Sequence, residues 1–349
     1  MKLLHKLLLL FVLVSVASCS KKTESQTTNV SSDPTSFTNP VLESGPDPWV
    51  IKKDSIYYYT NTLGNRIALR KTTAMSELSK AVLQTVWTPP SSGAYSKDLW
   101  APELHYLDGK WYVYFAADDG NNSNHRMYVL ESSSSDPLSS TWTLKGKLSA
   151  TTDKWAIDGT VLSYQDRYYF IWSGWEGDSD GQQNLYIAAM SNPYTIDGER
   201  VKISTPTYDW ETEGYPDVNE GPEVLKNSAG RIFLIYSASH CSTDGYCLGM
   251  LTLKDGGNPL SASDWIKSPN PVFTTVAGSG AYGPGHNSFF KSADNTEDWI
   301  LYHANSSAGQ GCGDTRNPRM QKFTWNSEGS PSFGSPVKIN TWVKKPSGE

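Results

Sequence analysis

The stretch PELHYLDGKWYVYFAA, residues 102–117, contains the pattern that decides the fold. It starts with a proline and an acidic residue, continues with a short apolar run, bends at Asp108-Gly109 and ends in an aromatic-rich run. An Asp-Gly pair between two such runs is typical of a β-hairpin. The pattern, with a small or acidic start, occurs four more times: DPWVIKKDSIYYYT at 47–60, DGTVLSYQDRYYFIWSG at 158–174, PEVLKNSAGRIFLIYSA at 222–238 and HNSFFKSADNTEDWILYHA at 286–304.

Successive copies of this hairpin start about 55 to 65 residues apart. A further alternating stretch follows the hairpins, for example at 126–130 and 185–188, and nothing between the copies has sustained helical periodicity. A repeated unit with four strands matches one blade of a β-propeller, a fold with about four to eight blades. A stack of β-sandwiches is the alternative, but it does not explain evenly spaced, similar hairpins. We therefore predict an all-β, five-bladed β-propeller over residues 40–349.

Residues 1–19 have the features of an export signal. Lys2 and Lys6 give the chain a positively charged start, and residues 7–16 form an apolar stretch that is too short to span a membrane permanently. The following Val-Ala-Ser-Cys resembles the bacterial lipobox, in which the cysteine, here Cys19, is lipidated; the alternative is an ordinary secretory signal with an incidental cysteine. Residues 20–39, rich in Ser, Thr, Lys and Gln, are expected to form a flexible tether. We expect an exported protein that an N-terminal lipid holds on the membrane of the bacterial cell envelope, in the periplasm or at the cell surface.

Charge, aromatic content and cysteine count limit which ligands and which cysteine chemistry we expect for this protein. The net charge of −6 is spread along the chain, so the basic patch that nucleic-acid binding requires is missing. The 13 Trp and 19 Tyr suit both propeller cores and the C–H faces of sugars. Beyond Cys19 there are three cysteines, which predicts one disulfide and one free thiol in an exported protein. The sequence does not choose the pair among Cys241, Cys247 and Cys312, although Cys247 with Cys312 would join two later segments.

The starts of the five copies should meet around one axis, because the innermost strand of every propeller blade lines the central channel. Asp47, Asp158 and Glu220 lie beside three of these starts. Each of them alone is explained as a solvated turn residue. Three carboxylates in one cleft repel each other and add little to stability, so a structural role does not explain the set. Glycoside hydrolysis needs such a set, with a protonated acid for the leaving oxygen and an ionised carboxylate for the attacking group. A third carboxylate can raise the pKa of its neighbour.

At these residues the sequence resembles glycoside hydrolase family 43. The motifs are GPDPWV at 45–50, LWAPELH at 99–105, WAIDGTV at 155–161, NEGPEVL at 219–225 and YGPGHNSF at 282–289. The similarity extends over residues 39–338. The family consists of five-bladed propellers that act with inversion, which agrees with the number of repeats.

The resemblance implies a role for each acid. Asp47 is similar to the general base, Asp158 to the residue that orients the acid and tunes its pKa, and Glu220 to the general acid. Glu223 is a rival for the acid role, but it lies three residues further into the strand, and we prefer Glu220. Inversion needs room for a water, so the carboxyl groups of Asp47 and Glu220 are expected about 6.5 to 9.5 Å apart. Asp47 should be ionised near neutral pH and Glu220 protonated before turnover.

Four further residues are candidates for substrate binding. Trp100 is a candidate platform for a sugar, or else a channel-wall aromatic, and Trp175 is similarly placed beyond a strand end. Arg319 resembles an arginine with which family members hydrogen-bond the terminal sugar. His286 begins the fifth copy, where related enzymes place a histidine beside an ion or water; a buried, satisfied histidine is the alternative. Calcium or another ion on the axis is therefore a candidate ligand, whereas hydrolysis requires no redox or organic cofactor.

Finer motifs indicate the substrate. AADDGNNSNHRMYVLES at 116–132, SGWEGD at 173–178 and GQGCGDTRNPRMQKFTW at 309–325 resemble exo-acting α-L-arabinofuranosidases, some of which act on α-1,5-linked arabinan. We expect release of L-arabinofuranose from plant cell-wall arabinan, arabinoxylan or arabino-oligosaccharides. A β-xylosidase or an endo-arabinanase of the same family and a non-catalytic carbohydrate-binding propeller are the alternatives; the complete acid trio argues against the last. A propeller phosphorylase would need a cluster of Arg, Lys and His near the blade starts, and none is present.

Overall fold

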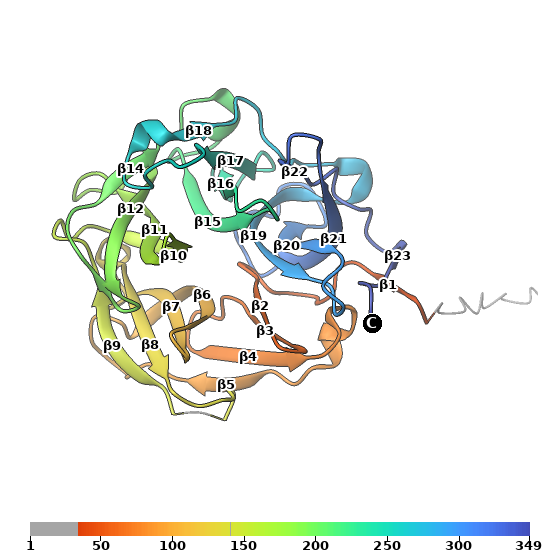
Figure 1. The fold of residues 1–349 in the computed structure, drawn as a ribbon, viewed down its shortest axis with the longest axis horizontal. Helices are drawn as coiled ribbons and strands as arrows, with labels where there is room; N and C mark the ends of the chain where they lie inside the picture. Colours follow the sequence, from red (N-terminus) through yellow and green to blue (C-terminus); the bar gives the residue numbers. More distant parts are fainter. Residues whose placement is uncertain (1–33, 140) are drawn as a thin grey trace, which may run out of the picture. The chain divides into compact units, whose positions relative to one another are not determined.

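The computed structural model describes residues 34–139 and 141–349. These residues form 23 β-strands and five 3-10 helices. Among them we find no helix with the length and apolar character of a membrane span. Five sheets surround a common axis as the blades of a propeller (Figure 1). The five-bladed β-propeller predicted from the repeats is confirmed.

Four blades have four antiparallel strands each, and the third has five. The first blade contains β2 (Trp49–Lys53), β3 (Ile56–Thr60), β4 (Ile67–Thr72) and β5 (Gln84–Trp87). The second contains β6 (Lys97–Leu107), β7 (Lys110–Asp118), β8 (Arg126–Ser132) and β9 (Thr143–Leu148). The third contains β10 (Ala156–Tyr164), β11 (Arg167–Trp175), β12 (Gln183–Asn192), β13 (Thr195–Ile196) and β14 (Val201–Ser204).

The fourth blade contains β15 (Asn219–Lys226), β16 (Ile232–Ala238), β17 (Cys247–Leu253) and β18 (Trp265–Lys267). The fifth contains β19 (Tyr282–Lys291), β20 (Asp298–Asn305), β21 (Asn317–Trp325) and β22 (Pro331–Ser332). The 3-10 helices lie in connections and are η1 (Met75–Lys80), η2 (Asn122–Asn124), η3 (Asp209–Glu211), η4 (Ala262–Asp264) and η5 (Ala277–Ser279).

Each copy of the sequence pattern forms the two innermost strands of one blade, as Figure 1 shows for β2, β6, β10, β15 and β19 around the axis. The turn of the second copy illustrates why. Asp108 and Gly109 have φ values of 49° and 78°, the left-handed pair that a tight hairpin turn requires, and they join Leu107 to its partner Lys110. The apolar runs on both sides then alternate between the two faces of the blade.

The apolar core consists of five clusters of buried side chains, one between each pair of neighbouring blades. A representative pair from each cluster is Leu69 with Trp111, Tyr114 with Phe170, Ile187 with Leu234, Leu248 with Tyr302, and Tyr59 with Trp299. The last pair joins the first blade to the fifth, so burial of apolar surface closes the ring. Ring closure brings the starts of the inner strands together.

The ends of the described chain are joined by a short sheet in which β1 (Ser36–Thr38) pairs antiparallel with β23 (Trp342–Lys344). Phe37 is buried, and the buried amide of Asn39 exchanges two 2.9 Å hydrogen bonds with the backbone of Met320. The expectation that the tether extends through residue 39 is therefore wrong at its end, because residues 36–38 pair with β23 and Asn39 is bonded to Met320. The predicted signal at 1–19, the lipidation at Cys19 and the tether up to residue 33 lie outside the described residues.

Candidate active site

A cavity of about 400 Å³ lies at the start of the inner strands and is lined by Asp47, Asp158 and Glu220. Asp47 and Asp158 are buried, and Glu220 is half-buried. Trp100 and His286 line the same cavity. The structure thus brings the three predicted acids into one pocket, from the first, third and fourth blades.

A backbone conformation that recurs in every blade orients these side chains. Five equivalent residues have left-handed φ values, namely Asp47 (56°), Ala101 (42°), Asp158 (54°), Gly221 (51°) and His286 (44°). Beside the last four of them, the register of the inner hairpin shifts as in a β-bulge. Such bulges redirect side chains, and left-handed backbone at non-glycine residues clusters at functional sites. This bulge-like turn therefore directs one residue of each blade toward the axis. In the fourth blade the left-handed residue is Gly221, and the side chain directed to the axis is that of the preceding Glu220.

Asp47 is held ionised by an arginine. Arg316 Nη1 donates a 2.8 Å hydrogen bond to Asp47 Oδ1. Burial raises the pKa of Asp47 more than any single neighbour lowers it, but the Arg316 guanidinium, the nearby histidines and a hydrogen bond from Thr62 together hold the pKa well below its usual range. A buried, ionised carboxylate beside a cavity is suited to accept a proton.

Two buried histidines next to Asp47 support it without adding a permanent charge. His303 Nδ1 accepts a 3.0 Å hydrogen bond from the backbone N–H of Asp47, so this nitrogen carries no proton. His286 Nδ1 lies 3.5 Å from Asp47 Oδ1 and 3.9 Å from Asp158 Oδ2. Burial lowers the pKa of both histidines. Since both are neutral near pH 7, Arg316 supplies the positive charge that keeps Asp47 ionised.

Glu220 has the opposite electrostatic environment. Its pKa is raised to about 7, chiefly by burial and also by the nearby Asp47 carboxylate. Tyr246 opposes this effect because its hydroxyl donates a 2.9 Å hydrogen bond to Glu220 Oε1. A carboxyl group with such a pKa can hold a proton near neutrality and give it up in a reaction.

Asp158 connects to the backbone that carries Glu220. Its Oδ2 accepts a 3.1 Å hydrogen bond from the backbone N–H of Gly221, the next residue in the chain. Burial, and then repulsion by the carboxylates of Glu220 and Asp47, raises the pKa of Asp158 well above its ordinary value. Because the carboxyl groups interact, protons leave Asp158 and Glu220 as a coupled pair.

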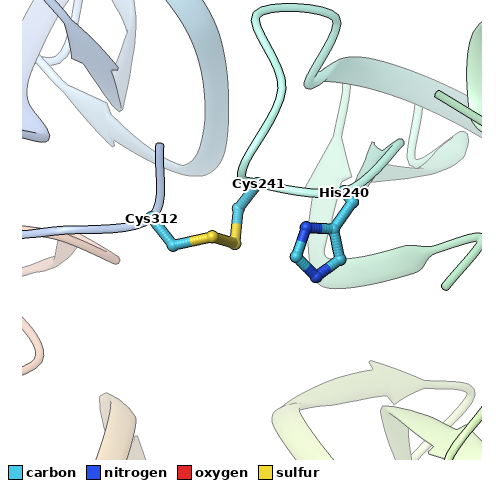
Figure 2. Close-up of side chains that lie close together, drawn as sticks. All are labelled: His240, Cys241 and Cys312. Carbon is cyan, nitrogen blue, oxygen red and sulfur yellow. A yellow bond between two sulfur atoms is a disulfide. The ribbon is translucent and has the colours of Figure 1, made fainter. Parts of the chain in front are cut away.

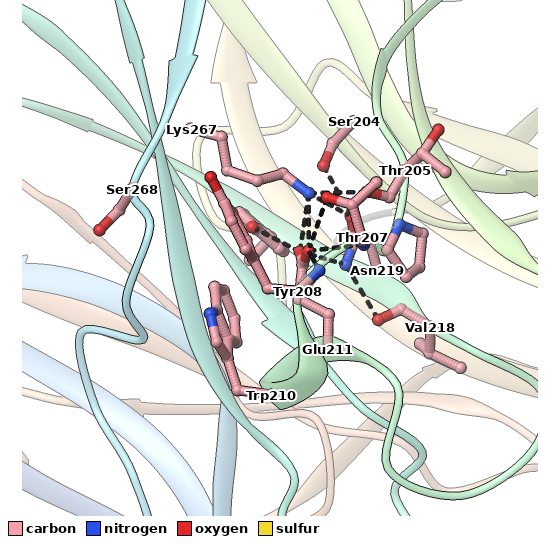
Figure 3. A network of polar contacts seen from close by, with 12 residues as sticks. Ser204, Thr205, Thr207, Tyr208, Trp210, Glu211, Val218, Asn219, Lys267 and Ser268 are labelled. Atoms are coloured by element: carbon pink, nitrogen blue, oxygen red, sulfur yellow. Dashed lines mark hydrogen bonds and ion pairs between the residues drawn. The ribbon is translucent and has the colours of Figure 1, made fainter.

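A buried ion pair fixes the start of the strand that carries Glu220 (Figure 3). Glu211 is fully buried and accepts hydrogen bonds from Lys267 Nζ (2.8 Å), Tyr236 Oη (2.9 Å) and Asn219 Nδ2 (3.0 Å). Asn219 immediately precedes Glu220, and its side chain also accepts a 2.6 Å bond from Ser204. Asn219, directly before the acid, is therefore held by both Glu211 and Ser204.

A disulfide forms part of the cavity wall. It joins Cys241 to Cys312 (Figure 2), with a Cα–Cα distance of 5.1 Å. Cys247 is a buried free thiol. The pairing of Cys247 with Cys312 considered from the sequence is wrong, because Cys247 lies inside the fourth blade at the start of β17. His240 lies beside the two sulfur atoms, which are bonded to each other and hence do not form a metal site with it.

The expected ion beside His286 stays a prediction. Within the described parts of the chain, the His240 cluster is the single group of three or more metal-binding side chains with ligand atoms within 4.8 Å of one another. His286, Asp47 and Asp158 do not form such a group. The side chains around His286 thus suit contact with a carboxylate or a water better than chelation of calcium.

The two predicted tryptophans have different positions. Trp100 lines the cavity and stacks on buried His125, with ring centroids 4.0 Å apart. Trp175 is buried and stacks on Trp155, with ring centroids 4.6 Å apart. Trp155, and not Trp175, lines the cavity, so the expectation that Trp175 is a sugar platform is wrong. Its side chain packs between the second and third blades instead of facing the opening.

The arginine predicted to bind the sugar, Arg319, does not line the cavity. Arg319 is fully buried and donates to Gly280 O (2.7 Å), Asn305 O (3.1 Å) and Asn317 Oδ1 (2.8 Å), away from the cavity lining. The expectation that Arg319 binds the sugar is therefore wrong, since its donors are used within the fold. Arg316, three residues earlier, is the arginine that lines the cavity.

The rival acid Glu223 lies elsewhere. It lines a second cavity of about 500 Å³ together with His105 and Thr160, further along the same inner strands. Burial, and then repulsion by Glu223, raises the pKa of Glu103 well above its ordinary value, and Glu103 Oε2 lies 2.8 Å from His105 Nε2. Glu220, which lines the first cavity with Asp47, is thus the glutamate placed to work with it.

Sequence reasoning missed the side chains that contact the acids from loops. Arg316 and Tyr246 lie in the β20–β21 and β16–β17 connections, which have no counterpart in the repeat. Arg316 was within a quoted motif, and the glycine-rich run 309–313 before it was the available signal for a loop that approaches the axis.

Comparison with known proteins gives a consistent result. A family model described as "Glycosyl hydrolases family 43" matches residues 37–331. An extracellular exo-α-(1→5)-L-arabinofuranosidase of Streptomyces avermitilis is 42% identical over 337 residues, covering 93% of this chain and 69% of the relative. A second protein of that name, from Streptomyces chartreusis, is 41% identical over 276 residues, covering 78% of this chain and 83% of the relative. The crystal structure of an α-L-arabinofuranosidase from Lactobacillus brevis superposes with a TM-score of 0.81 at 37% identity, covering 87% of this chain and 98% of that one.

Proposed function

The chain belongs to glycosyl hydrolase family 43, and from this membership and the pocket we propose that it is an inverting α-L-arabinofuranosidase. It releases single L-arabinofuranose units from the ends of α-1,5-linked arabinan or arabino-oligosaccharides. The curated relatives over 40% identical are both named exo-α-(1→5)-L-arabinofuranosidases, which supports this choice among family members. No redox or organic cofactor has a part in this reaction.

The reaction needs two proton transfers in one step. Glu220 gives its proton to the glycosidic oxygen as the bond from that oxygen to the anomeric carbon breaks. A water attacks the anomeric carbon from the opposite face, and Asp47 takes its proton. The product carries the inverted anomeric configuration, and one water is consumed for each bond broken.

One observation carries this assignment. Two acids lining a single cavity have pKa values displaced in opposite directions, with Asp47 held below its usual range and Glu220 raised to about 7. Such a separation distinguishes the base from the acid. Asp158 is a positioning residue, because it holds the backbone of Gly221 and adds negative charge near Glu220 when ionised.

The rest of the pocket binds the terminal sugar. Trp100 and Trp155 give the cavity aromatic walls of the kind that stack on sugar C–H faces. Arg316 uses one guanidinium nitrogen to hold Asp47. A guanidinium has several N–H donors, and we expect another of them to bind a sugar hydroxyl in the cavity. A pocket rather than an open groove suits removal of one terminal residue at a time.

Location is part of the proposal. The two Streptomyces relatives are named extracellular, and the N-terminal sequence has the features of an export signal. We propose that Cys19 carries a lipid that holds the enzyme on the cell envelope. Replacement by Cys19→Ser should then move the protein from the detergent phase to the aqueous phase in a Triton X-114 partition of expressing cells.

Product analysis tests the activity. The protein should release arabinose, and no larger product, from linear arabino-oligosaccharides, with no requirement for phosphate. Proton NMR of the first product should show the anomer opposite to that of the substrate. Asp47→Ala and Glu220→Ala variants serve as inactive controls on the same arabino-oligosaccharides. Release of xylose alone from a mixed panel with xylo-oligosaccharides would reject the substrate while leaving the fold and the acid pair intact.

A further inference from the structure

We propose that the Cys241–Cys312 disulfide is a positioning element for catalysis, because it joins two loops that contact the catalytic acids. One loop carries Arg316, which donates to the base, and the other carries Tyr246, which donates to the acid. The inference rests on the proposed function, in which Asp47 and Glu220 are that base and acid. Both cysteines line the catalytic cavity, and 71 positions of sequence separate them. They belong to the connections of the fourth and fifth blades.

The loop at 306–316 carries the base's partner. Arg316 stands four residues after Cys312 and donates the 2.8 Å bond to Asp47 Oδ1. Glycines at 309, 311 and 313 and exposed residues at 313–315 leave the segment few packing contacts of its own. Hydrogen bonds hold it at three points: Asn305 Nδ2 donates to Gly311 O (2.8 Å), Thr315 Oγ1 donates to Asn305 Oδ1 (2.8 Å), and the backbone N–H of Gly45 donates to Arg316 O (3.1 Å). A glycine-rich loop loses much conformational entropy when it is ordered, so a covalent attachment next to Arg316 has a large effect on where the guanidinium lies.

The loop at 239–246 carries the acid's partner. Tyr246 follows Cys241 by five residues and donates the 2.9 Å bond to Glu220 Oε1. Tyr246 is buried, and its ring stacks on that of His303 with centroids 5.8 Å apart. This loop is thus anchored by packing as well as by the disulfide.

The two loops have one other polar connection. Asp244 accepts hydrogen bonds from the backbone N–H of Gly309 at 2.9 and 3.2 Å, and this contact is exposed to solvent. An exposed hydrogen bond competes with water and contributes little. The disulfide is therefore the strong connection between the loops at the cavity wall.

The anchoring is unequal, and this gives the proposal its signature. When the disulfide is lost, the loop with Arg316 gains freedom, while Tyr246 stays packed against His303. Asp47 then loses its cation for part of the time, so the pKa of Asp47 rises and the acid limb of the activity profile moves to higher pH. The alkaline limb, which reports Glu220, should move less and in the same direction, because Arg316 is the smallest of the contributions to the pKa of Glu220. A disulfide with a purely structural role would lower stability and leave both limbs unchanged.

The test compares the full-length protein with its Cys241→Ser/Cys312→Ser and Cys247→Ser variants on a short arabino-oligosaccharide. We expect kcat/KM of the double variant at pH 7 to fall about 10- to 100-fold, since a misplacement of about 1 Å in a catalytic group can cost 10²-fold. Activity between about pH 3 and 5, around the ordinary Asp pKa, should fall more steeply. Cys247→Ser should match the unmodified protein, because its thiol lies away from the cavity lining.

Chemical reduction gives the same comparison without substitution. Dithiothreitol transfers two electrons and two protons to the disulfide, which becomes two thiols, and is itself oxidised to its cyclic disulfide. The reduced protein should reproduce the profile of the double variant, and reoxidation should reverse it, at a temperature where circular dichroism shows the propeller folded. The double variant should not respond to dithiothreitol, whereas Cys247→Ser should.

The outcomes are distinct. An acid limb that stays in place in both the double variant and the reduced protein overturns the proposal. Movement of the alkaline limb alone overturns it as well, because the loop of Tyr246 would then be the one released. If the unmodified protein cleaves no arabinofuranoside, the proposed function fails instead, and the disulfide has no catalytic pair to position.

Discussion

The hydroxyl of Tyr246 offers the most direct test of how the acid is tuned. It donates a 2.9 Å hydrogen bond to Glu220 Oε1, and this bond lowers a pKa that burial has raised. Tyr246→Phe removes the donor and keeps the ring that stacks on His303. The ionised form of Glu220 then loses stabilisation, so its pKa should rise above the present value of about 7.

The size of the shift follows from the strength of the bond. A hydrogen bond to a charged group contributes roughly 1.5–3 kcal/mol net. The protonated carboxyl can also interact with the tyrosine, so only part of this difference separates the two protonation states. About 1.4 kcal/mol corresponds to one pKa unit, and we therefore expect the alkaline limb of kcat/KM to move about one unit upward.

The assay is the pH dependence of kcat/KM on a short arabino-oligosaccharide, which reports the free enzyme. Activity depends on protonated Glu220, so it falls as the pH rises through the pKa of that group, and the Phe variant should retain activity at a pH where the unmodified enzyme has lost it. Tyr236→Phe is the matched control, because Tyr236 is a buried tyrosine of the same blade whose hydroxyl donates to Glu211 instead. An alkaline limb that stays in place or moves to lower pH in Tyr246→Phe would refute the reasoning.

Three further substitutions test the same network. Glu220→Gln should lower kcat about 10²- to 10⁴-fold on arabino-oligosaccharides, since no proton reaches the leaving oxygen, and much less on a dinitrophenyl arabinofuranoside, whose leaving group needs none; steady-state rates on both substrates check this. Arg316→Met removes the charge that holds the pKa of Asp47 down, so the acid limb of kcat/KM should move to higher pH. Lys267→Met leaves the buried carboxylate of Glu211 unpaired and should destabilise the fold by about 3–5 kcal/mol in urea unfolding, and adding Glu211→Gln should recover part of the loss.

The positions of the three acids could be predicted from the repeat, for two reasons. The copies of the hairpin locate the start of each inner strand, and ring closure brings those starts to one mouth. Asp47 and Asp158 occupy the left-handed position of their blades directly, and Glu220 precedes the glycine that occupies it in the fourth. A local backbone feature encoded in every copy therefore carries the information, and no loop conformation is required.

The errors fall where a side chain's direction depends on the neighbouring blade. Trp175 ends β11 and was expected at the opening, but its ring fills the space beside Trp155 in the interface between blades. Arg319 lies inside β21, where its donors meet backbone carbonyls, whereas Arg316 in the preceding loop reaches Asp47. The disulfide joins two connections of different blades, and their proximity exists only once the ring has closed. The tether boundary failed because the partner of β1 is a strand at the other end of the chain.

The division of labour between the two acids depends on a single cation. Burial raises the pKa of Asp47 and Glu220 alike, and the neighbouring histidines are neutral because burial lowers their pKa. Arg316 is bonded to Asp47, so its charge acts most strongly there and breaks the near symmetry of the pair. Once Asp47 is ionised, its negative charge raises the pKa of Glu220 further, and each acid thereby favours the protonation state the other requires. The fixed roles of base and acid follow from that one placement, which is why a loop outside the repeat determines how the residues inside it work.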